Sequence, residues 1–303
     1  MKKKRTIQCQ PREAGFLLSF QAMASPCEVL VDCKSKQHAQ QLGQIAATEA
    51  WRIEDKYSRY LQKSTCGQLN LNAGKNCKID QETYLLLKFS DDCFKMSDGL
   101  FDITSGVLRK AWCFDGSDNI PSQDQINTLL PFVGWQKTTL TEHSFLMEKG
   151  MEIDLGGLGK EYAVDRTLQL INKRTSAPVL INFGGDLATN KARIMQQSKK
   201  ITQPWQVGID HPSFDKQQVT VSITSGAVAT SGDANRFLLK EGKRFSHILN
   251  VKTGWPVENP PSAITVAAPQ CIQAGFLATL ALLQGKNAEL FLTEQEIKFW
   301  AIR

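Results

Sequence analysis

The spacing of apolar residues along the chain predicts helices and strands that occur in separate runs. Apolar residues recur at helical spacing in four segments, so we expect helices over residues 38–60, 85–96, 161–173 and 271–284. Shorter apolar runs bounded by turn residues predict strands. These runs cover residues 16–31 (two strands joined by a turn at 23–26), 151–154, 178–183, 205–209, 219–224, 236–240, 245–249 and 263–267. Such segregation favours an α+β fold over alternating βαβ units.

The composition indicates a globular protein with a small anionic ligand. The 303 residues are 42% hydrophobic and 22% charged, enough to bury a core without metals or disulfides. The formal net charge is +6, but much of the excess lies in residues 2–5 and in the pair Lys199–Lys200. Nucleic-acid binding would require a basic stripe with interleaved aromatic residues, which the sequence lacks. We expect a basic, flexible N-terminus over residues 1–15 and one domain over residues 16–303.

The cysteines and the lack of a long apolar run favour a reducing compartment. The eight cysteines form no CxxC pair and no metal-ligand spacing, so we interpret them as scattered thiols. The basic residues 2–5 resemble the start of a signal peptide, but polar residues follow from Gln8 onward instead of an apolar run. No segment approaches the about 18 apolar residues of a membrane span. For the sequence as given, we expect a cytoplasmic protein without an integral membrane segment.

The segment 151–165 contains the clearest indication of a ligand. An alternating strand is expected to run into Gly156, Gly157 and Gly159, which precede Lys160 and the third predicted helix. Glycines allow a ligand to approach the backbone, and N–H groups at a helix N-terminus stabilise anions. Lys160 adds a positive charge on the same side. The pattern predicts a phosphate-bearing ligand, although similar turns also occur without any ligand.

Three further glycine turns follow predicted strands, at residues 182–186, 230–233 and 253–256. Each of them alone is typical of an ordinary turn. Together with Lys160, Arg244 and His247 they favour one elongated, multiply charged ligand.

Several single residues have two interpretations. His247 lies within a predicted apolar strand, as either a core histidine or a phosphate contact and proton acceptor. Asp102 follows a helix end and enters a short predicted strand, where it either caps a turn or faces a ligand together with Asp154. Thr279 lies in the last apolar helix, where threonine usually bonds its own helix. A catalytic triad, a zinc site, a Walker motif and a GxGxxG fingerprint are not readable.

Taken in order, these blocks resemble the FAD:protein FMN transferase (ApbE) family. The matching blocks are residues 23–25, 57–60 with 69–70, 98–104, 154–165, 182–186, 230–233, 244–257 and 265–285. The resemblance implies an α+β fold similar to duplicated T-fold units, with antiparallel sheets and packed helices. It also implies binding of FAD, usually with Mg²⁺, and transfer of the FMN half onto a threonine hydroxyl of an acceptor flavoprotein, with release of AMP. Some members instead hydrolyse FAD to FMN and AMP.

The resemblance also implies which residues form the site. Met23 and Tyr60 would contact the flavin and adenine rings, with Asn70 nearby. The residues that would line the nucleotide site or bind its adenosine and diphosphate parts are Leu100, Phe101, Asp102, Asp154, Lys160, His247 and Ile248. The metal would be held by the backbone carbonyl of Gly157 and the hydroxyl of Thr279. His247 is the hypothesised catalytic residue, which would help to deprotonate the incoming threonine.

Two departures from the family pattern concern the metal. The family typically has an aspartate ligand four residues before the threonine of the last helix, and here that position is Gly275. Glu161 stands where glycine is usual. Because Mg²⁺ prefers carboxylate oxygens, loss of the aspartate is expected to weaken metal binding, and Asp186 or Asp233 are the possible substitutes. The alternative to a transferase is therefore an FAD-binding protein for flavin storage or sensing, with weak or lost transfer activity; FAD hydrolysis is a third interpretation.

Overall fold

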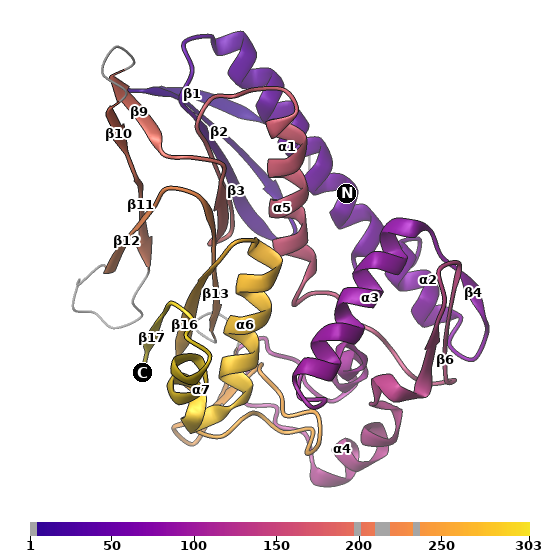
Figure 1. Ribbon diagram of the computed structural model, residues 1–303. Coiled ribbons are helices and arrows are strands. Elements are labelled where there is room, and N and C mark those ends of the chain that lie inside the picture. The colour runs from indigo at the N-terminus through magenta and orange to yellow at the C-terminus, as the bar shows by residue number, and fades with distance from the viewer. Residues whose placement is uncertain (1–4, 197–200, 210–218, 233–236) are drawn as a thin grey trace.

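An eight-stranded antiparallel sheet forms the centre of the molecule. The computed structural model describes residues 5–196, 201–209, 219–232 and 237–303. The strand order of the main sheet is β1-β2-β3-β7-β8-β13-β16-β17 (Figure 1). Its strands are β1 (Gln8–Arg12), β2 (Gly15–Ala22), β3 (Ser25–Val31), β7 (Val179–Phe183), β8 (Asp186–Thr189), β13 (Gly226–Gly232), β16 (Ala263–Ala268) and β17 (Phe299–Ile302). All neighbouring pairs are antiparallel.

Three long helices cover one face of the main sheet (Figure 1). Helix α1 (Lys36–Tyr57) packs on β2, α5 (Gly159–Asn172) on β7 and β8, and α6 (Cys271–Leu283) on β13 and β16. The apolar stripe of each helix meets the alternate residues of the strands in one large buried cluster. Glu49 lies on the buried stripe of α1, and its pairing with Arg52 at 2.8 Å offsets the cost of burying its charge.

The opposite face of the sheet is covered by a hairpin of β11 (Trp205–Ile209) and β12 (Val219–Ile223). A smaller pair, β9 (Arg193–Gln196) and β10 (Ile201–Gln203), lies next to it (Figure 1). Leu180 packs against this second layer, whereas its neighbour Ile181 packs toward the helices. Strand β7 is therefore buried on both faces, as its continuous apolar sequence indicates. Within the described part of the chain, no helix is long and apolar enough to cross a membrane.

A second group of elements lies beside the start of α5 and along α6 (Figure 1). It consists of α2 (Thr65–Leu71), α3 (Gln81–Met96), the 3-10 helix η1 (Ile103–Lys110), α4 (Gln123–Leu129), and a small sheet of β4 (Cys77–Lys78), β6 (Ser144–Met147) and β5 (Thr138–Leu140). The hairpin of β14 (Phe237–Lys240) and β15 (Lys243–Ser246) joins it from further along the chain. Val107, Ile126 and Leu238 form a separate buried cluster that connects η1, α4 and β14. Helix α7 (Ala288–Glu294) follows α6.

The predicted α+β class with antiparallel sheets and packed helices is confirmed, and the four predicted helices are present with small shifts at their ends. Three local predictions are wrong. Residues 151–154 are not a strand, Asp102 precedes a 3-10 helix rather than entering a strand, and His247 lies just beyond β15 rather than within a strand. Strand β1 occupies part of the segment expected to precede the domain, so the sheet begins at Gln8.

Candidate functional site

The turns at one end of the main sheet lie close to the start of α5. Met23 and Ala24 form the turn between β2 and β3, and Gly184 and Gly185 form the turn between β7 and β8. The Gly184 N–H donates to the carbonyl oxygen of Pro26 at 2.9 Å. A Cβ at Gly184 would lie 2.7 Å from the Ser25 side chain, and its φ is 63°. Close approach and a left-handed backbone therefore both require glycine there.

Lys160 extends from the first turn of α5 to this end of the sheet. Its Nζ forms an ion pair with Asp186, which is 2% exposed, and its Cδ lies 3.8 Å from the Cβ position of Gly184. Burial lowers the pKa of Lys160, but the charges of Asp186 and Glu161 and the hydrogen bond to Asp186 together raise it above its usual value, so the ammonium stays charged at neutral pH. The Asp186 carboxylate also accepts from the Thr230 N–H at 3.3 Å. A half-buried cation therefore lies at a helix N-terminus, where anions are stabilised.

The segment before α5 is held by Asn70 instead of by a neighbouring strand. The Asn70 side chain accepts from the Ile153 N–H at 2.8 Å and donates to the Ile153 carbonyl oxygen at 3.0 Å. Met151, Ile153 and Leu155 are buried and alternate with less buried residues. The alternation of buried and less buried residues is therefore present without a strand, because a side-chain amide takes the place of the strand partner. Asn70 fixes the backbone next to Asp154.

Asp154 connects this segment to Arg59 and Tyr60. Its carboxylate accepts from the Gly156 N–H at 2.9 Å and pairs with Arg59 through the other oxygen. The Arg59 guanidinium lies 5.0 Å from the centre of the Tyr60 ring and donates to its hydroxyl at 2.9 Å. Tyr60 is 75% exposed, so most of its ring is available to stack on a flat ligand. Sequence reasoning did not assign a function to Arg59, although it lies within the recognised block 57–60.

Asp102 is buried and bonded to backbone groups. One of its oxygens accepts from the Thr104 N–H at 2.8 Å and from the Thr104 hydroxyl at 2.6 Å, and the other accepts from the Trp135 N–H at 2.9 Å. Burial raises the pKa of Asp102. The carboxylate caps η1, as the turn-capping interpretation stated. The residue that follows Asp102 connects it to Asp154: the Asp154 N–H donates to the Ile103 carbonyl oxygen at 2.8 Å.

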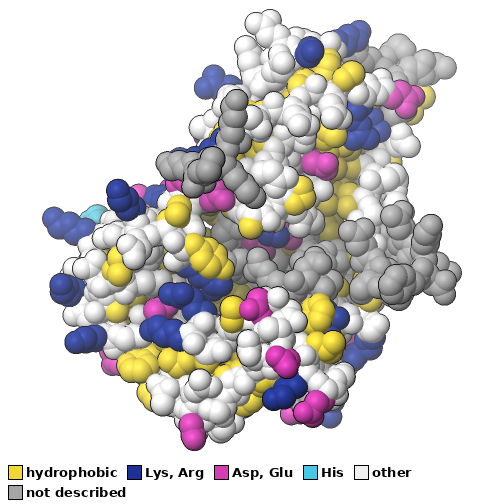
Figure 2. Space-filling model, turned by 180° about the vertical axis from the view of Figure 1, so that it is seen from behind, with side chains coloured by type: hydrophobic (Ala, Val, Ile, Leu, Met, Phe, Trp, Pro, Cys, Tyr) yellow, Lys and Arg dark blue, Asp and Glu magenta, His cyan; other side chains and the backbone are white. Residues whose placement is uncertain are grey.

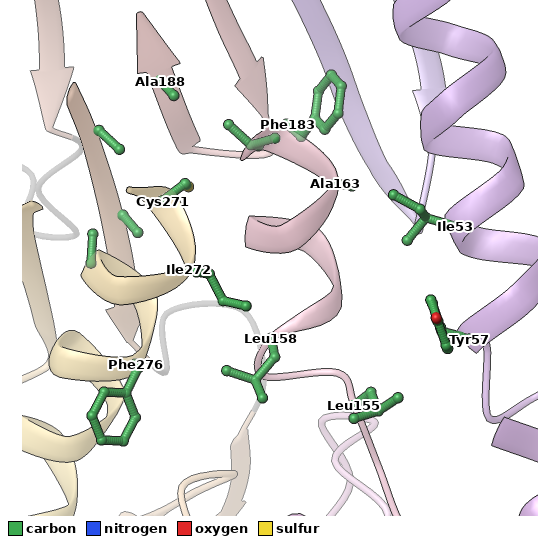
Figure 3. Close-up of a cluster of buried hydrophobic side chains, with 14 of the residues drawn as sticks. Ile53, Tyr57, Leu155, Leu158, Ala163, Phe183, Ala188, Cys271, Ile272 and Phe276 are labelled. Atoms are coloured by element: carbon green, nitrogen blue, oxygen red, sulfur yellow. The ribbon is translucent and has the colours of Figure 1, made fainter. Parts of the chain in front are cut away.

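Aromatic contacts join the glycine turn to α6. The Phe101 ring lies 3.9 Å from the Cβ position of Gly157 and packs edge-on against Phe276 of α6, at 5.3 Å between ring centres. Leu155 and Leu158 place the same turn between α1 and α6 (Figure 3). Leu100 is half-buried beside Phe101. The turn before α5 is thus fixed by apolar packing while its backbone groups remain near Lys160.

Met23 and His247 lie at different places around this centre. Met23 has a φ of 51°, and its N–H donates to Glu54 of α1 at 2.8 Å. His247 follows β15 and its ring packs edge-on against Phe114, at 6.2 Å between ring centres. The next residue, Ile248, packs against the main core, and its carbonyl oxygen accepts from Val257 at 3.0 Å. His247 is therefore held at the junction between the second group of elements and the main core.

The predicted metal residues lie against β13 and the start of α5. Thr279 of α6 shares a hydrogen bond of 2.7 Å with the hydroxyl of Ser231 at the end of β13. One turn earlier on α6, the Cβ position of Gly275 lies 2.7 Å from Cγ of Glu161. Glu161 is 8% exposed, and burial first and the charge of Asp186 second raise its pKa. No cluster of three or more His, Cys, Asp or Glu residues able to hold a metal was found among the described residues, so any site here must also use hydroxyl or carbonyl oxygens.

Hydrogen bonds and ion pairs thus assemble the residues predicted from the sequence into connected groups. Lys160, Asp186, Thr279 and the Gly184 turn meet at the end of the sheet, and Asn70, Asp154 and Tyr60 meet beside η1. Residues 154–160 and the Phe101–Phe276 contact join the two groups. From the side opposite to Figure 1, the surface is hollowed between the two halves of the molecule, with charged side chains in the hollow (Figure 2). A separate cavity of about 180 Å³ beside Arg193 and Trp205 is on the other face of the main sheet.

Comparison with known proteins places this arrangement in a family. A sequence model of the ApbE family matches residues 23–301. Among curated proteins, the FAD:protein FMN transferase of Vibrio cholerae is 24% identical over 249 residues, which cover 80% of this chain and 73% of that protein. The protein of the same name from Klebsiella pneumoniae is 27% identical over 237 residues, covering 76% of this chain and 71% of that protein.

Solved structures of ApbE proteins share the fold of this chain. The crystal structure of the ApbE protein of Thermotoga maritima has a TM-score of 0.83 and 25% identity, and the match covers 98% of this chain and 94% of that one. The flavinyl transferase ApbE of Pseudomonas stutzeri, 20% identical, shares the fold with a TM-score of 0.78, over 99% of this chain and 92% of that one. The family model covers nearly the whole domain, and the matching blocks of the sequence contain the residues of the connected site described above. The chain therefore belongs to the ApbE family.

Proposed function

We propose that this chain is an FAD:protein FMN transferase. It would move the FMN part of FAD onto a threonine hydroxyl of an acceptor flavoprotein and release AMP. Membership of the ApbE family and the curated relatives with this name support the proposal. The observation that carries it is the connected site, in which a half-buried Lys160 at a helix N-terminus lies one short turn from Asp154 and the exposed Tyr60 ring.

The chemistry of each group suits a different part of FAD. Tyr60 and Met23 would contact the flat rings, and Leu100 and Phe101 would form the apolar wall next to them. Asp154 would bind the adenosine hydroxyls, and Lys160 and the backbone at His247 and Ile248 would bind the diphosphate. Asn70 and Asp102 use their polar atoms on the protein backbone, so we assign them a positioning function.

Transfer would proceed by exchange of one phosphorus–oxygen bond for another. The threonine oxygen attacks the phosphorus of the FMN half, and the bond from this phosphorus to the oxygen shared with AMP breaks. The bonding electron pair leaves with AMP, and a ring nitrogen of His247 takes the hydroxyl proton. The position of His247 at the junction of the two parts of the molecule supports this assignment.

A divalent cation fits the oxygen-rich surroundings of Thr279. The buried Glu161 Oε2 has no hydrogen-bond partner among the residues that the structure describes, as expected for a carboxylate that meets a cation. Mg²⁺, when bound, would offset the negative charge that develops on the departing AMP. The Thr279 hydroxyl and the Gly157 carbonyl oxygen are the proposed ligands of this cation.

We also propose a cytoplasmic location. All eight cysteines are unpaired thiols in the structure, and Cys27, Cys66, Cys93 and Cys271 are buried. Unpaired thiols in this number are typical of a reducing compartment.

The test is incubation with FAD, Mg²⁺ and a flavoprotein domain known to accept FMN on threonine, followed by mass spectrometry of the acceptor and chromatography of the nucleotides. A transferase adds the mass of FMN to the acceptor and releases one AMP for each acceptor modified, and an acceptor with valine in place of the threonine stays unmodified. Free FMN with an unmodified acceptor would show hydrolysis instead. Retained, intact FAD would show a binding protein, and either outcome would overturn the proposal.

A further inference from the structure

Glu161 occupies the space that a side chain at position 275 would fill. A Cβ on Gly275 would lie 2.7 Å from Glu161 Cγ and 2.9 Å from its Oε1, so the two positions share one volume between α5 and α6. Gly275 and Thr279 are four residues apart on α6 and therefore lie on the same face of the helix. The Glu161 carboxylate thus reaches, from α5, the face of α6 that carries Thr279.

A series of contacts connects the neighbours of this carboxylate. Lys160 pairs with Asp186, and Asp186 accepts from the Thr230 N–H. The next residue on β13, Ser231, bonds the Thr279 hydroxyl, and α6 leads back over one turn to Gly275 and Glu161. Carboxylate oxygens of Glu161 and Asp186 and hydroxyl oxygens of Ser231 and Thr279 are therefore linked across four elements, α5, β8, β13 and α6. Such hard oxygens are the usual ligands of Mg²⁺.

The charges in this cluster are not balanced. Lys160 compensates one carboxylate, that of Asp186, whereas Glu161 Oε2 is buried without a hydrogen-bond partner among the described residues. The ionised form of a buried carboxyl group without a partner is unfavourable, and a further positive charge bound beside it would stabilise that form. Asp186 and Asp233 were the two possible substitutes for the missing aspartate ligand. Asp186 is already paired with Lys160. Asp233 lies outside the described residues.

We propose that Glu161 is the charged ligand of a divalent cation that also binds the Thr279 hydroxyl. This inference rests on the proposed function in that the cation would assist the transfer of FMN. It changes the expectation drawn from Gly275: the carboxylate is not lost but is supplied by the neighbouring helix, and the small size of Gly275 is what makes room for it.

The test measures the cation directly, without FAD or acceptor, so that it is independent of transfer. Mn²⁺ is titrated into the nucleotide-free protein, bound ion is followed by electron paramagnetic resonance, and Mg²⁺ is used to compete. Glu161→Gln keeps the size of the side chain and removes its charge; it is expected to lower Mn²⁺ affinity about tenfold or more. Glu49→Gln, which removes a buried carboxylate from the α1 pair with Arg52, is the matched control and should leave Mn²⁺ affinity unchanged.

Two further measurements separate a ligand from a space-filling residue. Glu161→Gln should abolish the rise in melting temperature that Mn²⁺ gives the parent, because the variant lacks the charged ligand. The double variant Glu161→Gly with Gly275→Asp returns the carboxylate to α6 and should recover Mn²⁺ binding. Equal Mn²⁺ affinity of Glu161→Gln and the parent, or no Mn²⁺ binding by the parent, would overturn the inference. A parent that binds Mn²⁺ through Glu161 but leaves the acceptor unmodified would refute only the proposed transfer.

Discussion

The Asn70 side chain pairs with both the N–H and the carbonyl oxygen of Ile153, at 2.8 and 3.0 Å. It thereby replaces a neighbouring strand for the segment that leads to Asp154 and the glycine turn before α5. A single residue of α2 therefore links the second group of elements to the start of the site.

We predict that Asn70→Ala destabilises the protein and weakens FAD binding. Loss of the amide leaves the Ile153 N–H without its side-chain acceptor and leaves the Ile153 carbonyl oxygen with only the weak bond from the Cys66 thiol at 3.5 Å. An unsatisfied group in a largely buried segment costs about 1–3 kcal/mol. Chemical denaturation and fluorescence titration with FAD would measure the two effects. Asn72→Ala, at a half-buried position of the same helix end, removes a side-chain bond to the Gln68 carbonyl oxygen and should change both quantities little. Equal behaviour of the two variants would argue against a positioning function of Asn70.

Asp154→Asn should weaken FAD binding while the protein stays folded. The amide can still accept from Gly156 but loses the charge that pairs with Arg59, so the site loses a charged acceptor for ligand hydroxyls. We expect the dissociation constant for FAD, measured by calorimetry, to rise by about one order of magnitude or more, corresponding to about 1.4 kcal/mol. Glu152→Gln, two residues earlier, breaks only pairs with Arg109 and Lys110 and serves as the control. If both variants bind FAD like the parent, Asp154 does not contact it.

Glu82 of α3 bonds side chains of α1 and α5, and these bonds make the free energy of unfolding depend on pH. Burial alone would raise the pKa of Glu82, but hydrogen bonds from Arg52, Lys56 and Tyr162 lower it to about 2. In the unfolded chain the pKa is about 4.3, so the stabilisation is fully present above that pH and is lost as the pH falls toward 2.

Glu82→Gln is therefore expected to lower the unfolding free energy at neutral pH and to reduce its decline between about pH 4.5 and 2.5. Urea denaturation at several pH values would measure both. Glu142→Gln changes an exposed glutamate and should follow the parent curve. If the unfolding free energy of Glu82→Gln falls with pH in parallel with that of the parent over this range, the lowered pKa of Glu82 would be contradicted.

His247→Ala should slow AMP release without loss of FAD binding. If the imidazole accepts the threonine proton, its removal should lower the transfer rate by about 10²- to 10⁴-fold. Single-turnover measurement of AMP at saturating FAD and acceptor isolates this step. His143→Ala, at an exposed position, is the matched control. A His247→Ala protein as fast as the parent would remove His247 from the proton transfer.

Sequence patterns predicted the helices and the class of the sheet because these depend on local periodicity. The apolar stripe from Leu42 to Tyr57 and the turn at Met23 are examples. The partners of polar residues depended on the tertiary fold and were not predictable. The alternation over 151–155 indicated a strand because the sequence does not show that Asn70 would take the place of one.

The same reason explains the Glu161 and Gly275 pair. Each departure from the family pattern was visible alone, but only the packing of α5 on α6 shows that the two share one volume. Asp102 is a second example. Its carboxylate was expected either to cap a turn or to face a ligand, and the bonds to Thr104 and Trp135 identify the cap.

The most direct measurement of the central claim is a calorimetric titration of the purified chain with FAD, repeated with Lys160→Met. If the groups around Lys160, Asp154 and Tyr60 form one site, the parent binds one FAD per chain, and the variant binds it much more weakly because the cation at the start of α5 is lost. No detectable binding of FAD by the parent, or equal binding by Lys160→Met, would contradict the account.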